Sequence, residues 1–194
     1  MYELPTSVQI DGELFKIRDK GDFRMVLHCF KILNAEDLNQ TEKIIACLQC
    51  FYEGLNELED VLALSQETVE ELSNEMFEFM SAGQQESKNP VKLIDWEQDE
   101  LLITSAVNKV AGKEIRLEKY IHWWTFIGYY IAIGECALSQ IVSIRHKIAH
   151  GTKLDKGERK FVSENPQYFN IDYRSAEQKA EDEYYRKLWN GGNA

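Results

Sequence analysis

The stretch from Ile121 to Gly151 constrains the fold more than any other part of the chain. Its apolar residues recur at steps of three and four, which places them on one side of an α-helix. The main row contains Trp123, Ile127, Tyr130, Gly134, Ala137, Ile141, Ile144 and Ile148. Shorter apolar rows lie beside it, and a helix that is apolar around most of its circumference is buried. We therefore predict one long central helix over about residues 121–150, with the other helices packed around it.

The rest of the chain predicts a mainly α-helical fold with a small N-terminal β-hairpin over residues 7–17. Asp11-Gly12 lies between two short apolar segments, which is a strong signal for a two-residue hairpin turn. Helix starts are expected at side chains that accept hydrogen bonds from backbone N–H groups. The predicted caps are Asp22, Asn39 or Thr41, Ser65 and Asp95.

We expect a single helical domain over residues 1–170. A small, polar segment that contains Pro90 predicts a flexible linker near residues 82–92. Residues 171–194 form a charged C-terminal helix or tail in this interpretation. There, Ala176, Ala180, Tyr184 and Leu188 recur at every fourth position, which predicts a weakly amphipathic helix over Arg174 to Trp189.

Charge and hydropathy exclude several classes of partner. The net charge is −11, and a negative protein repels the phosphate backbone, so we expect no nucleic-acid partner. The uninterrupted apolar run from Trp123 to Ile133 is shorter than the roughly 20 residues that span a bilayer. No N-terminal signal sequence is visible. We expect a soluble protein of the cytoplasm that does not enter membranes.

Two pairs of residues have the spacing of metal ligands, but neither completes a site. Cys47 and Cys50 form a C-x-x-C pair without a second pair, and core packing explains them better. His146 and His150 are four residues apart, without the glutamate that follows the first histidine in zinc hydrolases. We expect no metal and no cofactor.

The segment RHKIAHG, from Arg145 to Gly151, has two interpretations. It resembles the R-x4–6-H motif of HEPN ribonucleases, in which His150 would act on a ribose hydroxyl and Arg145 would hold the phosphate. It also fits an ordinary helix C-terminus, where the negative end of the helix dipole stabilises cations and a glycine follows the last turn.

Five aromatic residues of the central stretch are candidates for a partner-binding surface: Trp123, Trp124, Phe126, Tyr129 and Tyr130. They could all belong to the core. However, three apolar rows on one helix are more than one neighbour can cover, and aromatic residues dominate binding hot spots. We therefore expect some of them to contact a partner.

Several motifs resemble a family of small proteins from siphophages of Gram-positive hosts, encoded just before the tail tape-measure gene. In chain order they are PTSVQIDGELFKI from Pro5, DFR from Asp22, DWEQD from Asp95, HWWTF from His122, IVSIR from Ile141 and LDKGERKF from Leu154. HWWTF is the most specific of them. Together they span Pro5 to about Asn165.

The resemblance implies a non-enzymatic tail assembly chaperone of the bacterial host cytoplasm. Such a protein would bind the apolar tape-measure protein in several copies, as a homo-oligomer, and would leave as the tail-tube protein polymerises. An acidic helical protein with spare aromatic surface suits the covering of apolar helices. The alternative function is the HEPN-like ribonuclease that uses Arg145 and His150.

Overall fold

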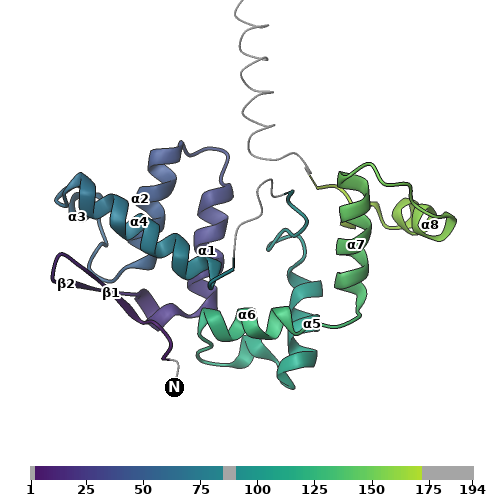
Figure 1. Cartoon of the computed structure of the whole chain (residues 1–194), viewed down its shortest axis with the longest axis horizontal. Coiled ribbons are helices and arrows are strands. Elements are labelled where there is room, and N and C mark those ends of the chain that lie inside the picture. Colours follow the sequence, from purple (N-terminus) through teal and green to yellow (C-terminus); the bar gives the residue numbers. More distant parts are fainter. Residues whose placement is uncertain (1–2, 85–90, 172–194) are drawn as a thin grey trace, which may run out of the picture. The chain divides into compact units, whose positions relative to one another are not determined.

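The computed structural model describes residues 3–84 and 91–171, and most of its regular structure is helical (Figure 1). The two strands are β1 (Ser7–Ile10) and β2 (Glu13–Lys16). The α-helices are α1 (Phe23–Asn34), α2 (Gln40–Phe51), α3 (Leu58–Leu62), α4 (Gln66–Ser81), α5 (Glu100–Ala111), α6 (Trp123–Ile131), α7 (Ala137–Ala149) and α8 (Lys156–Glu164). Short 3-10 helices are η1 (Arg18–Gly21), η2 (Ile115–Leu117) and η3 (Pro166–Tyr168). The predicted fold class, mainly α with an N-terminal hairpin, is confirmed.

The chain divides into two compact units, which are described separately below. Unit 1 comprises Met1–Gln85 and Thr104–Ile133, and unit 2 comprises Glu86–Ile103 and Gly134–Ala194. The single domain expected over residues 1–170 stays a prediction. The predicted linker near 82–92 lies largely outside the described residues, as does the predicted C-terminal helix.

The predicted long helix over residues 121–150 is wrong, because the chain forms two helices there. α6 ends at Ile131, and α7 begins at Ala137. Between them, Cys136 is fully extended (φ −162°, ψ 177°), and its N–H donates to the Ser139 hydroxyl at 2.9 Å. Gly134, a poor helix former, lies in the gap. The apolar periodicity continues through the break, so periodicity could not reveal it.

In unit 1, the hairpin and several helices enclose an aromatic core. β1 and β2 pair antiparallel through Asp11 and Gly12, both with positive φ, as the Asp-Gly signal predicted. β1 packs on α4, and α1 packs on α2. The buried ring of Phe51 contacts Tyr52 and Phe79 edge to face, with centroids 4.8 and 5.2 Å away.

Three of the predicted caps hold the helices of unit 1 as expected. The Asp22, Asn39 and Ser65 side chains accept N–H bonds at the starts of α1, α2 and α4. The glutamates of α4 face solvent, as its apolar stripe predicted: Glu67, Glu70, Glu71, Glu75 and Glu78 are exposed. Local sequence signals were sufficient for these elements.

The described part of unit 2 contains α7, α8, η3 and the segment that leads into α5. Its buried apolar residues are Ile103, Leu138, Ile141 and Ile144. Asp95 was predicted to cap α5. Instead, its carboxylate accepts from the Glu97 and Gln98 N–H groups in a turn that precedes the helix. α5 begins in unit 2 and continues into unit 1.

Gly21 provides a test of packing in unit 1. Its φ is +77°, and a Cβ there would lie 2.6 Å from Phe79 Cζ. Gly112 has a similar φ of +69° with open space around it. We expect Gly112→Ala to cost about 1–2 kcal/mol of unfolding free energy for the left-handed backbone. Gly21→Ala should cost about 1–3 kcal/mol more for the steric overlap.

Urea unfolding of the two alanine variants measures this difference. Equal losses of stability would show that the Phe79 ring moves aside without cost, and would contradict the prediction.

Candidate partner-binding surface

Asp22 holds the start of α6 against the start of α1. Its Oδ1 accepts the Arg24 N–H at 3.0 Å, and its Oδ2 accepts the Ile121 N–H at 2.9 Å. The Phe23 N–H donates back to the Ile121 carbonyl at 2.9 Å. Asp22 is buried, and the Arg24 guanidinium bonds both of its carboxylate oxygens at 3.0 Å. One carboxylate therefore serves two chain segments that are far apart in the sequence.

His122 caps α6 with an imidazole instead of a hydroxyl or carboxylate. Nδ1 accepts the Trp124 N–H at 3.0 Å, so the hydrogen is assigned to Nε2, which lies 3.0 Å from the Pro5 carbonyl. The side chain is 1% exposed. Burial lowers the pKa of His122, although the Pro5 carbonyl and the nearby Asp22 carboxylate act in the opposite direction.

The two tryptophans of the HWWTF motif bind the end of α4. Trp123 Nε1–H donates to the Met80 carbonyl at 2.9 Å, and Trp124 Nε1–H donates to the Phe79 carbonyl at 3.0 Å. The last carbonyls of a helix have no partner within the helix, so side chains or water must satisfy them. The indoles supply donors to both carbonyls here, although the Phe79 carbonyl also accepts the Ala82 N–H at 3.1 Å, and these bonds fix the orientation of both rings.

Two of the five predicted partner-binding residues lie in the core of unit 1. Trp123 and Phe126 are each 1% exposed. The Phe126 ring stacks on Phe23, with centroids 4.7 Å apart and planes nearly parallel. In this conformation neither side chain offers a surface to a partner. The binding role of the set as a whole stays a prediction.

The exposed side of α6 carries a different set of residues. Trp124 is 37% exposed and Ile131 is 64% exposed. Gly128, also exposed, lies between them, and a Cβ there would meet open space. At i, i+4 and i+7 these residues share one helix face, which we name the α6 strip. Tyr129 and Tyr130 are half-buried.

Sequence reasoning placed Trp124 in the candidate set but omitted Ile131. The signal was present, because both residues belong to a secondary apolar row beside the main one. Trp123 and Ile127 of the main row lie in the core instead, together with Phe126 from another row. Sequence alone could not tell which row would be buried, because each row has helical spacing.

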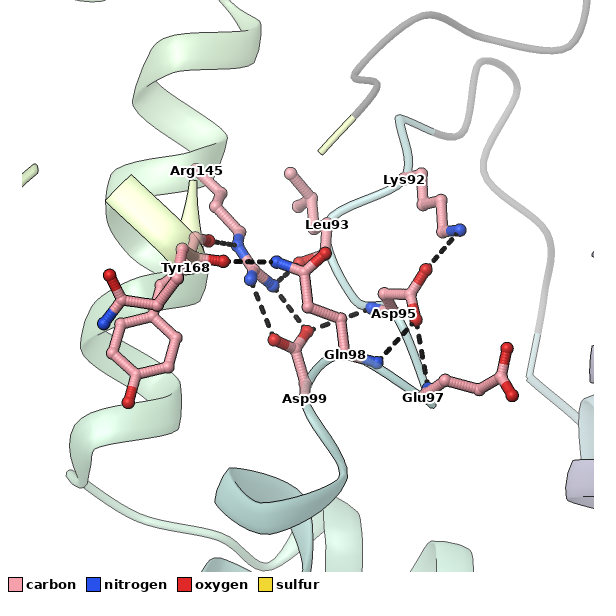
Figure 2. Close-up of polar contacts among 9 residues, drawn as sticks. Lys92, Leu93, Asp95, Glu97, Gln98, Asp99, Arg145 and Tyr168 are labelled. Atoms are coloured by element: carbon pink, nitrogen blue, oxygen red, sulfur yellow. Dashed lines mark hydrogen bonds and ion pairs between the residues drawn. The ribbon is translucent and has the colours of Figure 1, made fainter. Parts of the chain in front are cut away.

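Arg145 is not available as a phosphate ligand. Figure 2 shows its guanidinium reaching from α7 to Asp99, with Nη2–Oδ1 at 2.8 Å and Nη1–Oδ2 at 2.5 Å. Nε donates to the Tyr168 carbonyl at 2.8 Å, and Nη1 also donates to the Leu93 carbonyl at 2.9 Å. Both charged side chains are 0% exposed. The arginine therefore joins three segments of unit 2.

His150 is exposed at the end of α7. Its Nδ1 lies 2.8 Å from the His146 carbonyl, and the two imidazole rings stack with centroids 4.2 Å apart. Gly151 follows with φ +64°, as expected at a helix C-terminus. Within residues 3–84 and 91–171, no three His, Cys, Asp or Glu side chains are grouped to hold a metal ion.

The Cys47-x-x-Cys50 pair lies on α2 and faces α1. The Cys47 thiol is fully buried, and its Sγ lies 3.6 Å from the Cys29 carbonyl. The Cys50 thiol is half-buried and contacts the Met25 carbonyl at 3.9 Å. These contacts agree with the predicted role in core packing.

Removing the negative partner of Arg145 should strongly destabilise unit 2. We expect Asp99→Asn to lower the free energy of unfolding by about 3–5 kcal/mol, because a buried guanidinium would lose its counter-charge. Glu100→Gln changes an exposed acid at the next position and should cost at most about 1 kcal/mol. Chemical denaturation compares the two. A loss for Asp99→Asn no larger than that of the control would contradict the structural role of the pair.

Acid should destabilise unit 1 through His122. The folded state disfavours the protonated imidazole, so the unfolded chain takes up a proton at higher pH. The free energy of unfolding should therefore fall as the pH decreases below about 6.5. Denaturation at a series of pH values from neutral to mildly acidic measures the decrease. His122→Gln should remove this part of the pH dependence, whereas His28→Gln, at an exposed histidine, should leave it. If the unfolding free energy of both variants depends on pH in the same way, His122 is not the cause of the decrease.

No helix within the described residues is long and apolar enough to cross a membrane.

Comparison with known proteins identifies a family for nearly the whole chain. No curated protein and no solved structure matches the chain. A family model described as "Bacteriophage Gp15 protein" matches residues 1–171, which include Asp22, the α6 strip and the Arg145–Asp99 pair. The chain therefore belongs to the bacteriophage Gp15 protein family.

Proposed function

We propose that this phage protein is a tail assembly chaperone that binds the tape-measure protein in the host cytoplasm. It keeps the tape-measure protein soluble until the tail-tube protein polymerises around it. The phage family and the resemblance in the HWWTF, DWEQD and IVSIR segments support this role. Neither a catalytic step nor a cofactor belongs to the proposal.

The α6 strip is the observation that carries the proposal. Covering exposed apolar area by an apolar helix of the partner contributes about 25 cal/mol of favourable binding free energy per Å². The indole of Trp124 is already held by its bond to the Phe79 carbonyl, so little side-chain freedom is lost on binding. The absence of a side chain at Gly128 allows a partner helix to approach closely between Trp124 and Ile131.

The acidic surface suits the same role. The net charge is −11, and α4 presents a solvated row of glutamates. A strong net charge keeps proteins dispersed in solution. Several copies on one tape-measure protein would therefore keep the whole complex from aggregating.

The ribonuclease alternative receives no support from the position of Arg145. Its guanidinium is paired with Asp99 and two carbonyls, and it has no exposed surface. Holding a phosphate would require breaking a buried ion pair, which is strongly destabilising.

Co-expression with the adjacent tape-measure protein tests the proposal. Soluble tape-measure protein should co-purify with the tagged chain. Insoluble tape-measure protein beside a clean, unpartnered chain would contradict the chaperone role.

Two matched variants test the α6 strip. Ile131→Lys changes the last residue of α6, and Leu62→Lys changes the last residue of α3, which is similarly exposed at 66%. A lysine at a helix C-terminus interacts favourably with the negative end of the helix dipole, so both variants should fold. Ile131→Lys should weaken binding about tenfold or more, because one buried isoleucine is lost. Leu62→Lys should bind normally. Equal binding by both variants would place the interface elsewhere.

A further inference from the structure

Three cysteine side chains lie together where α1 packs against α2 in unit 1 (Figure 1). Cys29 is on α1, and Cys47 and Cys50 are on α2; all three thiols are free. The Cys29 thiol hydrogen-bonds with both of the other thiols. Cys47 Sγ also lies 3.6 Å from the Cys29 carbonyl, and Cys50 Sγ lies 3.9 Å from the Met25 carbonyl, one turn earlier on α1. We name these three cysteines the thiol cluster.

Cys50 is the accessible member of the thiol cluster. Cys29 and Cys47 are each 0% exposed, whereas Cys50 is half-buried. A reagent that arrives from solution therefore meets the Cys50 sulfur first, and the two buried thiols lie behind it.

Two neighbours favour the ionised form of Cys50. The Cys29 S–H donates to the Cys50 sulfur, and this bond lowers the pKa of the Cys50 thiol. The Arg18 guanidinium also lowers this pKa, and together they outweigh the opposite effects of burial and Asp19. Arg18 is held at the site, because its Nε donates to the Cys50 carbonyl at 3.1 Å. Since the thiolate is the nucleophilic form of cysteine, Cys50 combines reactivity with access.

Of the two buried thiols, Cys29 is the better placed to react with an oxidised Cys50. Cys47 and Cys50 are three residues apart on one helix, where Cβ atoms are about 5–6 Å apart. A disulfide brings two Cβ atoms to about 3.5–4.5 Å, so Cys47 would reach Cys50 only if α2 unwound. Cys29 approaches from another helix and already bonds the Cys50 sulfur.

Oxidation of Cys50 also makes Cys29 more reactive. Hydrogen bonding to the Cys47 and Cys50 thiols, together with burial, raises the pKa of Cys29. A sulfenic acid at Cys50 is neutral, so the negative charge that opposes ionisation of Cys29 is lost at that step.

We propose that Cys50 is a site of reversible oxidation by hydroperoxides, with Cys29 as its resolving thiol. The Cys50 thiolate attacks the terminal oxygen of the hydroperoxide, the O–O bond breaks, and hydroxide or alkoxide leaves, so that Cys50 becomes a sulfenic acid. The Cys29 sulfur then attacks the Cys50 sulfur, and its proton combines with the departing hydroxide to form water. The disulfide joins α1 to α2, and a dithiol reductant reverses the oxidation. This inference does not depend on the chaperone role.

Mass spectrometry of the full chain tests the assignment. After brief treatment with hydrogen peroxide and blocking of the remaining thiols, digestion should give two peptides linked through Cys29 and Cys50. Dithiothreitol should separate them. Cys29→Ala should abolish this disulfide and leave a Cys50 sulfenic acid that dimedone traps. Cys47→Ala, which also removes one buried thiol of the cluster, should retain the linked pair.

Cys136 provides an internal control for the reactivity of Cys50. It is half-buried as well, but it belongs to unit 2 and not to the thiol cluster. Iodoacetamide at neutral pH should label Cys50 several-fold faster than Cys136 in the folded chain, because a larger fraction of Cys50 is thiolate. In concentrated urea the two rates should become similar, because the thiol cluster is lost.

Two results would overturn the proposal. The first is labelling of Cys50 that is no faster than labelling of Cys136 in the folded chain. The second is a peroxide-treated, unmodified chain in which Cys29 and Cys50 are not linked to each other within one molecule. Neither measurement needs a variant, so a folding defect in Cys29→Ala would leave the test intact.

Discussion

The structure of unit 1 depends on satisfying the backbone groups at the ends of its helices. Asp22 serves the first turn of α1 and the Ile121 N–H at the same time. His122 caps α6, and the indoles of Trp123 and Trp124 donate to the last carbonyls of α4. An unpaired buried N–H or carbonyl costs about as much as a lost hydrogen bond. The HWWTF motif is therefore explained first by architecture, and only the second of its tryptophans is left partly exposed.

Unit 2 meets a related requirement with charge. Arg145 and Asp99 are both fully buried, so each is tolerated only because the other is present. The guanidinium also reaches the Leu93 and Tyr168 carbonyls, which ties the start of the unit to its last described turn. A motif that resembles a ribonuclease site in the sequence thus has a structural explanation for its arginine, whereas its histidine lies on the surface.

Local signals in the sequence predicted the hairpin and several helix starts, whereas apolar spacing alone gave the wrong length for the helix over residues 121–150. Asp-Gly set the hairpin turn, and Asp22, Asn39 and Ser65 marked helix starts, because capping involves only a few neighbouring residues. The break after Ile131 escaped notice, because the apolar rows keep their spacing across Gly134. Their spacing continues although α6 and α7 belong to different units.

The sequence by itself determined the helical class, the hairpin turn and the caps of α1, α2 and α4. Only the tertiary structure decided which apolar residues of 121–150 lie in the core. Trp123 and Phe126 face the core, whereas Trp124 and Ile131 face outward. The physical reason is that helical periodicity fixes which residues share a face, but not what lies opposite that face. The opposing groups, Phe23 and the end of α4, come from segments much earlier in the chain.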